Sequence, residues 1–129
     1  MNSKSSWSLN KLSPQFPVAD LNRTIDFYTN QLSFEIAFRY EDFYCGLAKD
    51  GHSVNFKLSE LPLTIFSLHG NEEDIDIHLV FSIDRIEDVW EIIKTKPIRV
   101  IQPLREMPYG KEFYIADPDG YRIGFIEGR

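Results

Sequence analysis

The sequence contains little of what disulfide, metal and nucleic-acid-binding proteins require. A single cysteine, Cys45, stands among 129 residues, which excludes an intrachain disulfide and a cysteine-rich zinc site. The three histidines, His52, His69 and His78, allow a metal site only if carboxylates supply other ligands. Acidic residues outnumber basic ones by 20 to 14, and Lys and Arg form no cluster. The charge pattern therefore argues against nucleic-acid binding.

Long apolar segments are also missing. No apolar run approaches the roughly 20 residues that span a bilayer, and residues 1–12 lack the apolar core of a secretory signal. We therefore expect a cytoplasmic protein that does not bind a membrane. Residues 1–11, rich in Ser, Asn and Lys, predict a flexible N-terminal arm, and residues 12–129 predict one domain. Its 43% hydrophobic and 14% aromatic residues predict a packed core.

Two segments repeat the same order of features. Residues 42–56 and 112–125 both read acid-Phe-Tyr, a short run ending in Ala, an Asp-Gly turn and an alternating strand that closes on Phe. Asp-Gly is typical of tight hairpin turns because Gly tolerates the positive φ that they need. We therefore expect a β-hairpin at the end of each copy.

A strand, a helix and a further strand precede each hairpin. In the first copy, the strand over residues 16–20 ends at a helix cap, and residues 35–40 predict the strand after the helix. In the second copy, residues 77–83 predict a strand, Asp84 the N-cap of the helix, and residues 98–103 the next strand. The sequence thus predicts an α+β fold of two βαβββ modules, about 12–69 and 74–127, with residues 70–74 as the seam.

Each predicted helix has one apolar face. Helical spacing places these residues together in the first and second helix, respectively: Leu21, Ile25, Tyr28, Leu32; and Ile86, Val89, Trp90, Ile93. The strands alternate instead with a period of two, so each has an apolar face for the helix to cover and an opposite polar face. The polar faces carry Gln15, Asn55, Lys57, His78 and Arg122. If the two modules curl together, these residues line a polar cup suited to a small molecule.

Three motifs resemble those of the vicinal oxygen chelate superfamily, which includes glyoxalase I, extradiol dioxygenases, and fosfomycin and bleomycin resistance proteins. They are residues 17–21 running into 26–28, residues 78–83, and Tyr109-Gly110 followed by residues 113–120 with their Asp-Pro-Asp-Gly turn. The resemblance covers about residues 12–127. It implies two curved mixed sheets around a cup, helices on the outer face, and a homodimer with the cups near the subunit interface.

The resemblance also implies a divalent metal held by the first and last strand of each module. Carried over by position, its ligands fall on Ser13, Asn55, His78 and Gly124, and only His78 matches the His/Glu/Gln pattern. One imidazole does not hold a catalytic transition metal. We therefore expect no metal, no other cofactor and no catalytic residue, with His78 as a weak metal candidate. Glu127 lies nearby on the opposite strand parity and is expected to point away.

The resemblance further implies that the loop from Arg105 to Gly110 borders the cup, where Tyr109 would stack on a planar ligand. The predicted ligand-binding residues are therefore Gln15, Asn55, Lys57, His78, Tyr109 and Arg122. The function expected is binding of a small organic molecule, as in bleomycin resistance proteins. Its specific form would be sequestration of a drug or metabolite. The alternatives are a metal-dependent lyase, isomerase or dioxygenase of glyoxalase type, and a regulatory module that binds a partner.

Two observations point to opposite charges for the ligand. The net charge of -6 favours a cationic ligand, whereas Lys57 and Arg122 within the predicted cup do not. The apolar segment over residues 61–66 is expected to pack on the core, to cover the cup or to meet a second subunit.

Overall fold

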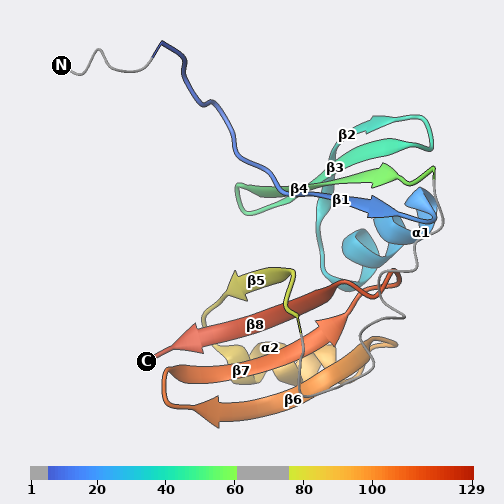
Figure 1. Ribbon diagram of the computed structural model, residues 1–129. Helices are drawn as coiled ribbons and strands as arrows, with labels where there is room; N and C mark the ends of the chain where they lie inside the picture. Colours follow the sequence, from blue (N-terminus) through green and yellow to red (C-terminus); the bar gives the residue numbers. More distant parts are fainter. Residues whose placement is uncertain (1–5, 61–75) are drawn as a thin grey trace.

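The computed structural model describes residues 6–60 and 76–129 of the chain (Figure 1). Module 1 comprises β1 (Gln15–Val18), α1 (Leu21–Asp26), the π-helical turn η1 (Phe27–Gln31), β2 (Glu35–Tyr40), β3 (Tyr44–Lys49) and β4 (His52–Leu58). Module 2 comprises β5 (Leu79–Ser82), α2 (Ile86–Ile93), β6 (Arg99–Met107), β7 (Gly110–Ala116) and β8 (Arg122–Gly128). The predicted α+β fold with tandem βαβββ modules is confirmed. The segments over residues 61–66 and 70–74, with His69 between them, lie outside the described residues.

The two sheets have the same topology. Sheet A has the strand order β1-β4-β3-β2 and sheet B the order β5-β8-β7-β6. The first strand of each module runs parallel to its last strand, whereas the hairpin strands pair antiparallel. The register is equivalent as well, since Gln15 pairs with Asn55 in sheet A and Val80 with Gly124 in sheet B. A residue of module 1 therefore has a definite counterpart in module 2.

The apolar faces predicted for both helices pack into the core. In module 1 the four predicted residues are all buried: Leu21, Ile25, Tyr28 and Leu32. In module 2, Ile86 and Ile93 are buried, and Val89 and Trp90 pack against the core from partly buried positions. Asp20 caps α1 as expected, because its carboxylate accepts the backbone N–H of Arg23 at 3.2 Å.

The N-cap predicted for α2 is wrong. Arg85, in the left-handed conformation, and not Asp84 occupies the N-cap position, and its side chain makes no cap hydrogen bond. Instead, the carboxylate of Glu127 on β8 accepts the backbone N–H groups of Arg85 at 3.1 Å and Ile86 at 3.0 Å. A residue 41 positions away thus does the work of a local cap. Glu127 points towards α2, as its strand parity predicted.

β6 extends beyond its predicted end at residue 103 and runs to Met107. Pro103 is tolerated inside β6 because β6 is an edge strand. On its outer side there is no neighbouring strand to which a backbone N–H would donate. The pairing of β6 with β7 also shifts register between Gln102 and Arg105, next to this proline. Among the described residues, no helix is long and apolar enough to cross a membrane.

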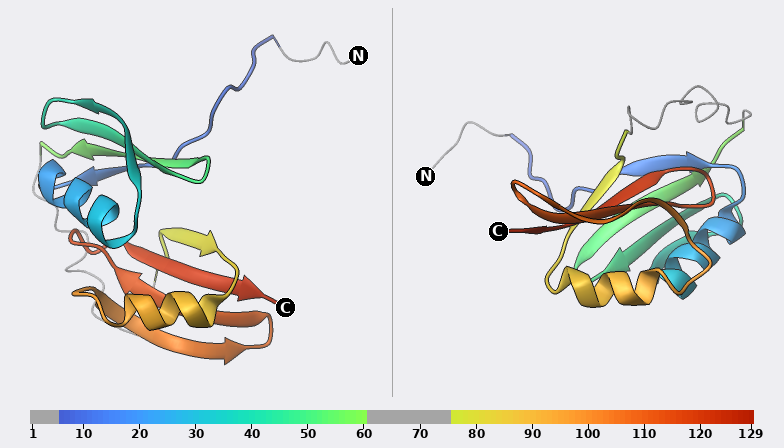
Figure 2. Two further views of the ribbon diagram at one scale, coloured as in Figure 1. Left: turned by 180° about the vertical axis from the view of Figure 1, so that it is seen from behind. Right: turned by 90° about the horizontal axis from the view of Figure 1, so that it is seen from below.

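The modules meet through the Asp-Pro-Asp-Gly turn of module 2. Asp119 Oδ1 accepts the backbone N–H of Ala19 and a guanidinium N–H of Arg23, both at 3.0 Å, and Oδ2 accepts the hydroxyl of Thr24 at 3.0 Å. The helical segment of module 1 therefore lies between sheet A and module 2, and the view from behind shows the same arrangement (Figure 2, left). The opposite face of sheet A points away from module 2.

Candidate functional site

Each sheet has a face that no helix of its module covers, and we call these the open faces. Strand alternation places on the open face of module 1 the residues Phe38, Tyr40, Tyr44, Gly46, Asn55 and Lys57. It places on the open face of module 2 the residues Arg105, Glu112, Tyr114, Arg122 and Gly124. The two faces hold most of the polar residues that the sequence singled out.

Three of the six predicted ligand-binding residues lie on module 1. Gln15 on β1 is the register partner of Asn55 on β4, and Lys57 follows two positions further along. Gln15 and Lys57 are exposed, whereas Asn55 is half-buried and donates through Nδ2 to the Tyr44 hydroxyl at 3.2 Å. Asn55 Oδ1 is buried without a hydrogen-bond partner among the described residues. The open face thus offers an acceptor beside an aromatic group built around Tyr44.

That aromatic group has a specific shape. The rings of Tyr40 and Tyr44 are nearly parallel, with centroids 6.2 Å apart, and the Phe38 ring meets the Tyr44 ring edge-on at 5.1 Å. The Phe38 ring lies where a side chain at Gly46 would project, so glycine is required there for close packing. Sequence reasoning missed this group, although the period-two alternation of β2 and β3 places these three aromatic residues on one face of the sheet.

His78 lies apart from Asn55. Its backbone N–H donates to the Arg122 carbonyl at 2.9 Å, and its Nδ1 accepts the Arg122 N–H at 3.0 Å. Its ring packs edge-on against Phe16 and Tyr121, with centroid distances of 6.3 and 5.2 Å. Phe16 itself contacts the core ring of Phe56, which points to the face of β4 opposite to Asn55. His78 therefore sits at the junction of the modules.

The remaining two predicted residues belong to module 2. Tyr109 lies in the turn between β6 and β7, and Arg122 begins β8. Sequence reasoning missed Glu112, whose side chain is fully buried and accepts hydrogen bonds from Tyr109, Tyr114 and Arg105. The sequence did carry a signal for it. Glu112 and Tyr114 alternate in β7 with the core residue Phe113, which predicts that both lie on the open face.

The four positions of the expected metal site do not form a metal site. Ser13 Oγ is hydrogen-bonded to Ser53 Oγ at 2.7 Å, His78 Nδ1 accepts a backbone N–H, and Gly124 has no donor. Hydroxyl and amide groups with one imidazole are a poor ligand set for a catalytic divalent ion. These residues do not fit the metal that the superfamily's enzymes hold. The described part of the chain contains no other group of three His, Cys, Asp or Glu residues that could hold one.

A cavity of about 790 Å³ lies between the modules. Its walls come from the end of η1, the tip of the β3–β4 hairpin, β5 and α2. The apolar lining includes Leu32, Phe34, Val54, Leu79, Phe81, Ile92, Ile93 and Phe125. The charged residues are Lys49, Asp50 and Lys96, with His52 beside them. We call this space the inter-module cavity.

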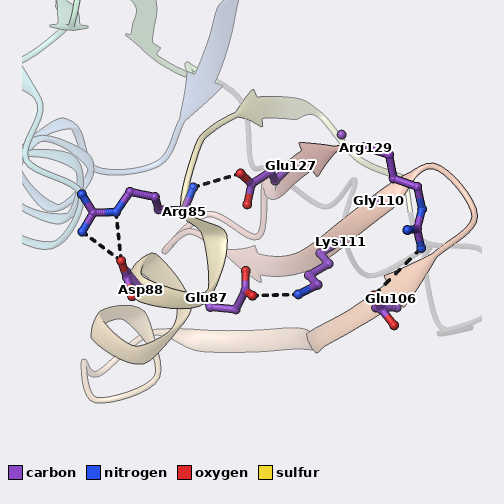
Figure 3. Close-up of a pocket in the computed structure, with 9 residues that line it drawn as sticks. Arg85, Glu87, Asp88, Glu106, Gly110, Lys111, Glu127 and Arg129 are labelled. Atoms are coloured by element: carbon purple, nitrogen blue, oxygen red, sulfur yellow. Dashed lines mark hydrogen bonds and ion pairs between the residues drawn. The ribbon is translucent and has the colours of Figure 1, made fainter.

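The second cavity, of about 500 Å³, is polar and lies at the start of α2 beside the β6–β7 turn (Figure 3). Its charges pair with one another: Lys111 Nζ lies 2.7 Å from Glu87, Arg85 lies 3.0 Å from Asp88, and Arg129 lies 3.9 Å from Glu106. The hydrogen bond with Glu87 raises the pKa of Lys111 and lowers that of Glu87, which keeps both charged. These pairs leave little charge unmatched for a ligand. The six predicted residues line neither cavity, and their role stays a prediction.

The fold agrees with comparison to known proteins. The model of the Glyoxalase/Bleomycin resistance protein/Dioxygenase superfamily matches residues 10–125. The chain belongs to this superfamily. No curated protein matches the sequence.

Among solved structures of similar fold is a glyoxalase/bleomycin resistance protein/dioxygenase from Alicyclobacillus acidocaldarius, with 17% identity, 92% of both chains covered and a TM-score of 0.71. TnmS3, an antibiotic binding protein from Streptomyces sp. CB03234, has 17% identity, 95% and 100% coverage and a TM-score of 0.67. The fosfomycin resistance protein FosX from Listeria monocytogenes has 17% identity, 95% and 96% coverage and a TM-score of 0.68. At this identity, these similarities establish the fold alone.

Proposed function

We propose that this superfamily member binds a small, largely apolar organic molecule in the inter-module cavity and holds it without metal chemistry. The observation that carries the proposal is the cavity itself. Its volume of about 790 Å³ falls within the range of roughly 300–1,000 Å³ typical of small-molecule sites. Its lining is mainly aliphatic and aromatic, with a few polar groups at hand to orient a ligand.

Two further observations support binding over catalysis. The residues at the expected metal positions, with Gly124 in place of a carboxylate, do not fit a catalytic metal. The similar structures include one described as an antibiotic binding protein. Sequestration of a drug or toxic metabolite is therefore the specific form of the proposal.

The charges of the cavity differ in sign from those of the whole chain. The chain carries a net charge of -6, but the cavity is lined by Lys49 and Lys96 against the single acid Asp50. The acidic balance therefore describes the outer surface, and the cavity favours a neutral ligand over a cationic one.

We also propose that the protein is a homodimer. The open face of module 1 points away from module 2 and exposes aromatic surface, including Tyr40, which is 59% exposed. A cup between the open faces of modules 1 and 2 then requires a second chain. Sedimentation equilibrium is expected to return twice the chain mass of 15.1 kDa, and a monomer at all concentrations would contradict the dimer.

Titration with Nile red, a neutral apolar fluorophore, tests the cavity. Ile92 lines the cavity from α2 and is 57% exposed, so Ile92→Trp fills part of the space without disturbing the core. Ile36→Trp is the matched control, since Ile36 is 49% exposed on the edge strand β2 and does not line the cavity. We expect saturable binding that weakens at least tenfold in I92W only. Absent saturation in the wild-type protein, or equal weakening in both variants, contradicts the proposal.

A further inference from the structure

The inter-module cavity is lined by an unusual residue at the point where the helical segment of module 1 ends. Ser33 follows η1 and has a φ of 62°, in the left-handed region. The backbone N–H of Phe34 donates to the Tyr28 carbonyl at 2.9 Å, which closes the last turn over this residue. Helices that end on a left-handed residue usually place glycine there, because a side chain makes that conformation costly. The chain therefore has a serine where the backbone alone favours glycine.

The side chain of Ser33 has no local role that explains this choice. Serine is favoured in turns when its hydroxyl bonds to nearby backbone groups. Within the described part of the chain, the Ser33 hydroxyl makes no such hydrogen bond. It is exposed and lines the cavity, so it is available to a ligand there.

Two more polar side chains of the cavity lining have no partner. Gln31, at the end of η1, and Lys96, just after α2, are both half-buried. Neither side chain makes a hydrogen bond or an ion pair with another described residue. An ammonium group that is partly withdrawn from water loses hydration, and an anionic ligand would replace what it loses.

The other charges of the lining balance one another. Lys49 Nζ lies 3.8 Å from the Asp50 carboxylate. Among the described residues of the lining, Lys96 is therefore the charge that stays unmatched. Its neighbour Lys94 pairs with Glu91 at 2.7 Å and does not line the cavity. A ligand with one negative charge complements this lining, whereas a cation adds to the positive charge already present.

An apolar wall adjoins these polar groups. Phe34, directly after Ser33, contacts Phe81 of module 2 with ring centroids 5.9 Å apart. Phe81 in turn packs edge-on against Phe125 at 5.1 Å, and all three rings line the cavity. The cavity therefore offers hydrogen-bond donors and a hydrocarbon surface next to each other.

We propose that the ligand of the inter-module cavity is an amphiphilic monoanion, of the class of medium-chain carboxylates. This inference rests on the proposed function and adds a subsite for the charged head group. Lys96 supplies the countercharge, and Ser33 and Gln31 donate hydrogen bonds to the carboxylate oxygens. The apolar body of the ligand lies against Phe34 and Phe81.

Displacement of Nile red by decanoate, decanol and decylammonium tests the ligand class, because the three probes share a chain and differ in the head group. We expect decanoate to displace Nile red at a concentration at least tenfold lower than decylammonium does. Lys96→Gln should weaken decanoate binding at least fivefold and leave Nile red and decanol unchanged. Lys94→Gln is the matched control, because it removes the same charge outside the cavity and should leave decanoate binding unchanged. Equal displacement by the three probes, or equal effects of the two lysine substitutions, overturns the proposal.

Ser33 has its own readout. Ser33→Gly removes the hydroxyl and suits the left-handed backbone, so it should not lower the free energy of unfolding, yet it should weaken decanoate binding at least threefold. Unchanged decanoate affinity in S33G overturns the role of Ser33.

The same titrations separate this inference from the proposed function. If Nile red does not saturate in the wild-type protein, the cavity does not bind apolar molecules, and both proposals fail. If Nile red saturates and decanoate does not displace it, the anionic head group is wrong and the proposed function stands. Ile92→Trp should weaken Nile red and decanoate together, because both occupy the same cavity.

Discussion

The phenol of Tyr28 donates a 2.7 Å hydrogen bond to Asp117 Oδ2, and both groups are buried. Tyr28 belongs to the helical segment of module 1, and Asp117 opens the Asp-Pro-Asp-Gly turn of module 2. Asp117 Oδ1 accepts the backbone N–H groups of Asp119 and Tyr121, both at 2.9 Å. One carboxylate therefore organises its own turn and attaches it to the other module.

Removing this link is expected to destabilise the protein. Tyr28→Phe keeps the buried ring but leaves Asp117 Oδ2 without its donor, which should lower the free energy of unfolding by about 1–3 kcal/mol. Urea denaturation measures the loss. Tyr40→Phe is the control, since Tyr40 is exposed and should change stability by less than about 0.5 kcal/mol. Equal effects of the two substitutions would contradict the role of the link.

Asp117 should also make stability depend on pH in an unusual direction. Burial raises its pKa to about 6, although its hydrogen bonds oppose the shift. The folded protein then binds more protons than the unfolded chain between about pH 4 and 6, so this group's contribution falls as pH rises. Between pH 5 and 7 the free energy of unfolding should drop by about 1 kcal/mol. Asp117→Asn should flatten this slope, and a slope that persists in the variant would contradict the assignment.

Asp119 should contribute more to stability than an exposed aspartate in a similar ion pair. Its side chain is 1% exposed, and besides Arg23 it accepts hydrogen bonds from Ala19 and Thr24 at the start of α1. Asp119→Ala should lower the free energy of unfolding by about 1–3 kcal/mol. Asp42→Ala provides the comparison, because Asp42 pairs with Arg39 at 2.7 Å but its side chain is 79% exposed. Thermal unfolding of both variants measures the two losses of stability. A larger loss for D119A shows that burial decides the contribution, and equal losses would show that the ion pair does.

Glu127 should stabilise α2 from outside the helix. Glu127→Ala removes the acceptor for the N–H groups of Arg85 and Ile86, and we expect a loss of about 1 kcal/mol together with faster amide exchange at Ile86. Glu106→Ala is the control, because Glu106 contributes only a 3.9 Å ion pair with Arg129. Unchanged exchange at Ile86 in E127A would show that the cap is dispensable.

Local patterns predicted most of the fold. The helical face of Leu21, Ile25 and Tyr28 follows from spacing alone, because the helix period depends on neighbouring residues. The strand at residues 35–40 was placed by the order of features that the two modules share. Parity likewise predicted that Glu127 points away from Gly124. The cap at Asp84 failed because a distant carboxylate does its work. The open-face positions of Asn55, Lys57 and Arg122 were predictable, whereas the position of His78 at the module junction was not.

By itself, the sequence determined that the chain is a tandem pair of βαβββ modules. Only the tertiary structure decided how the modules meet, where the inter-module cavity lies, and that Glu112 is buried under Arg105 and Tyr109. The contacts responsible join residues up to 104 positions apart. Periodicity describes one strand or helix at a time, so it carries no information about which faces of two such elements come together.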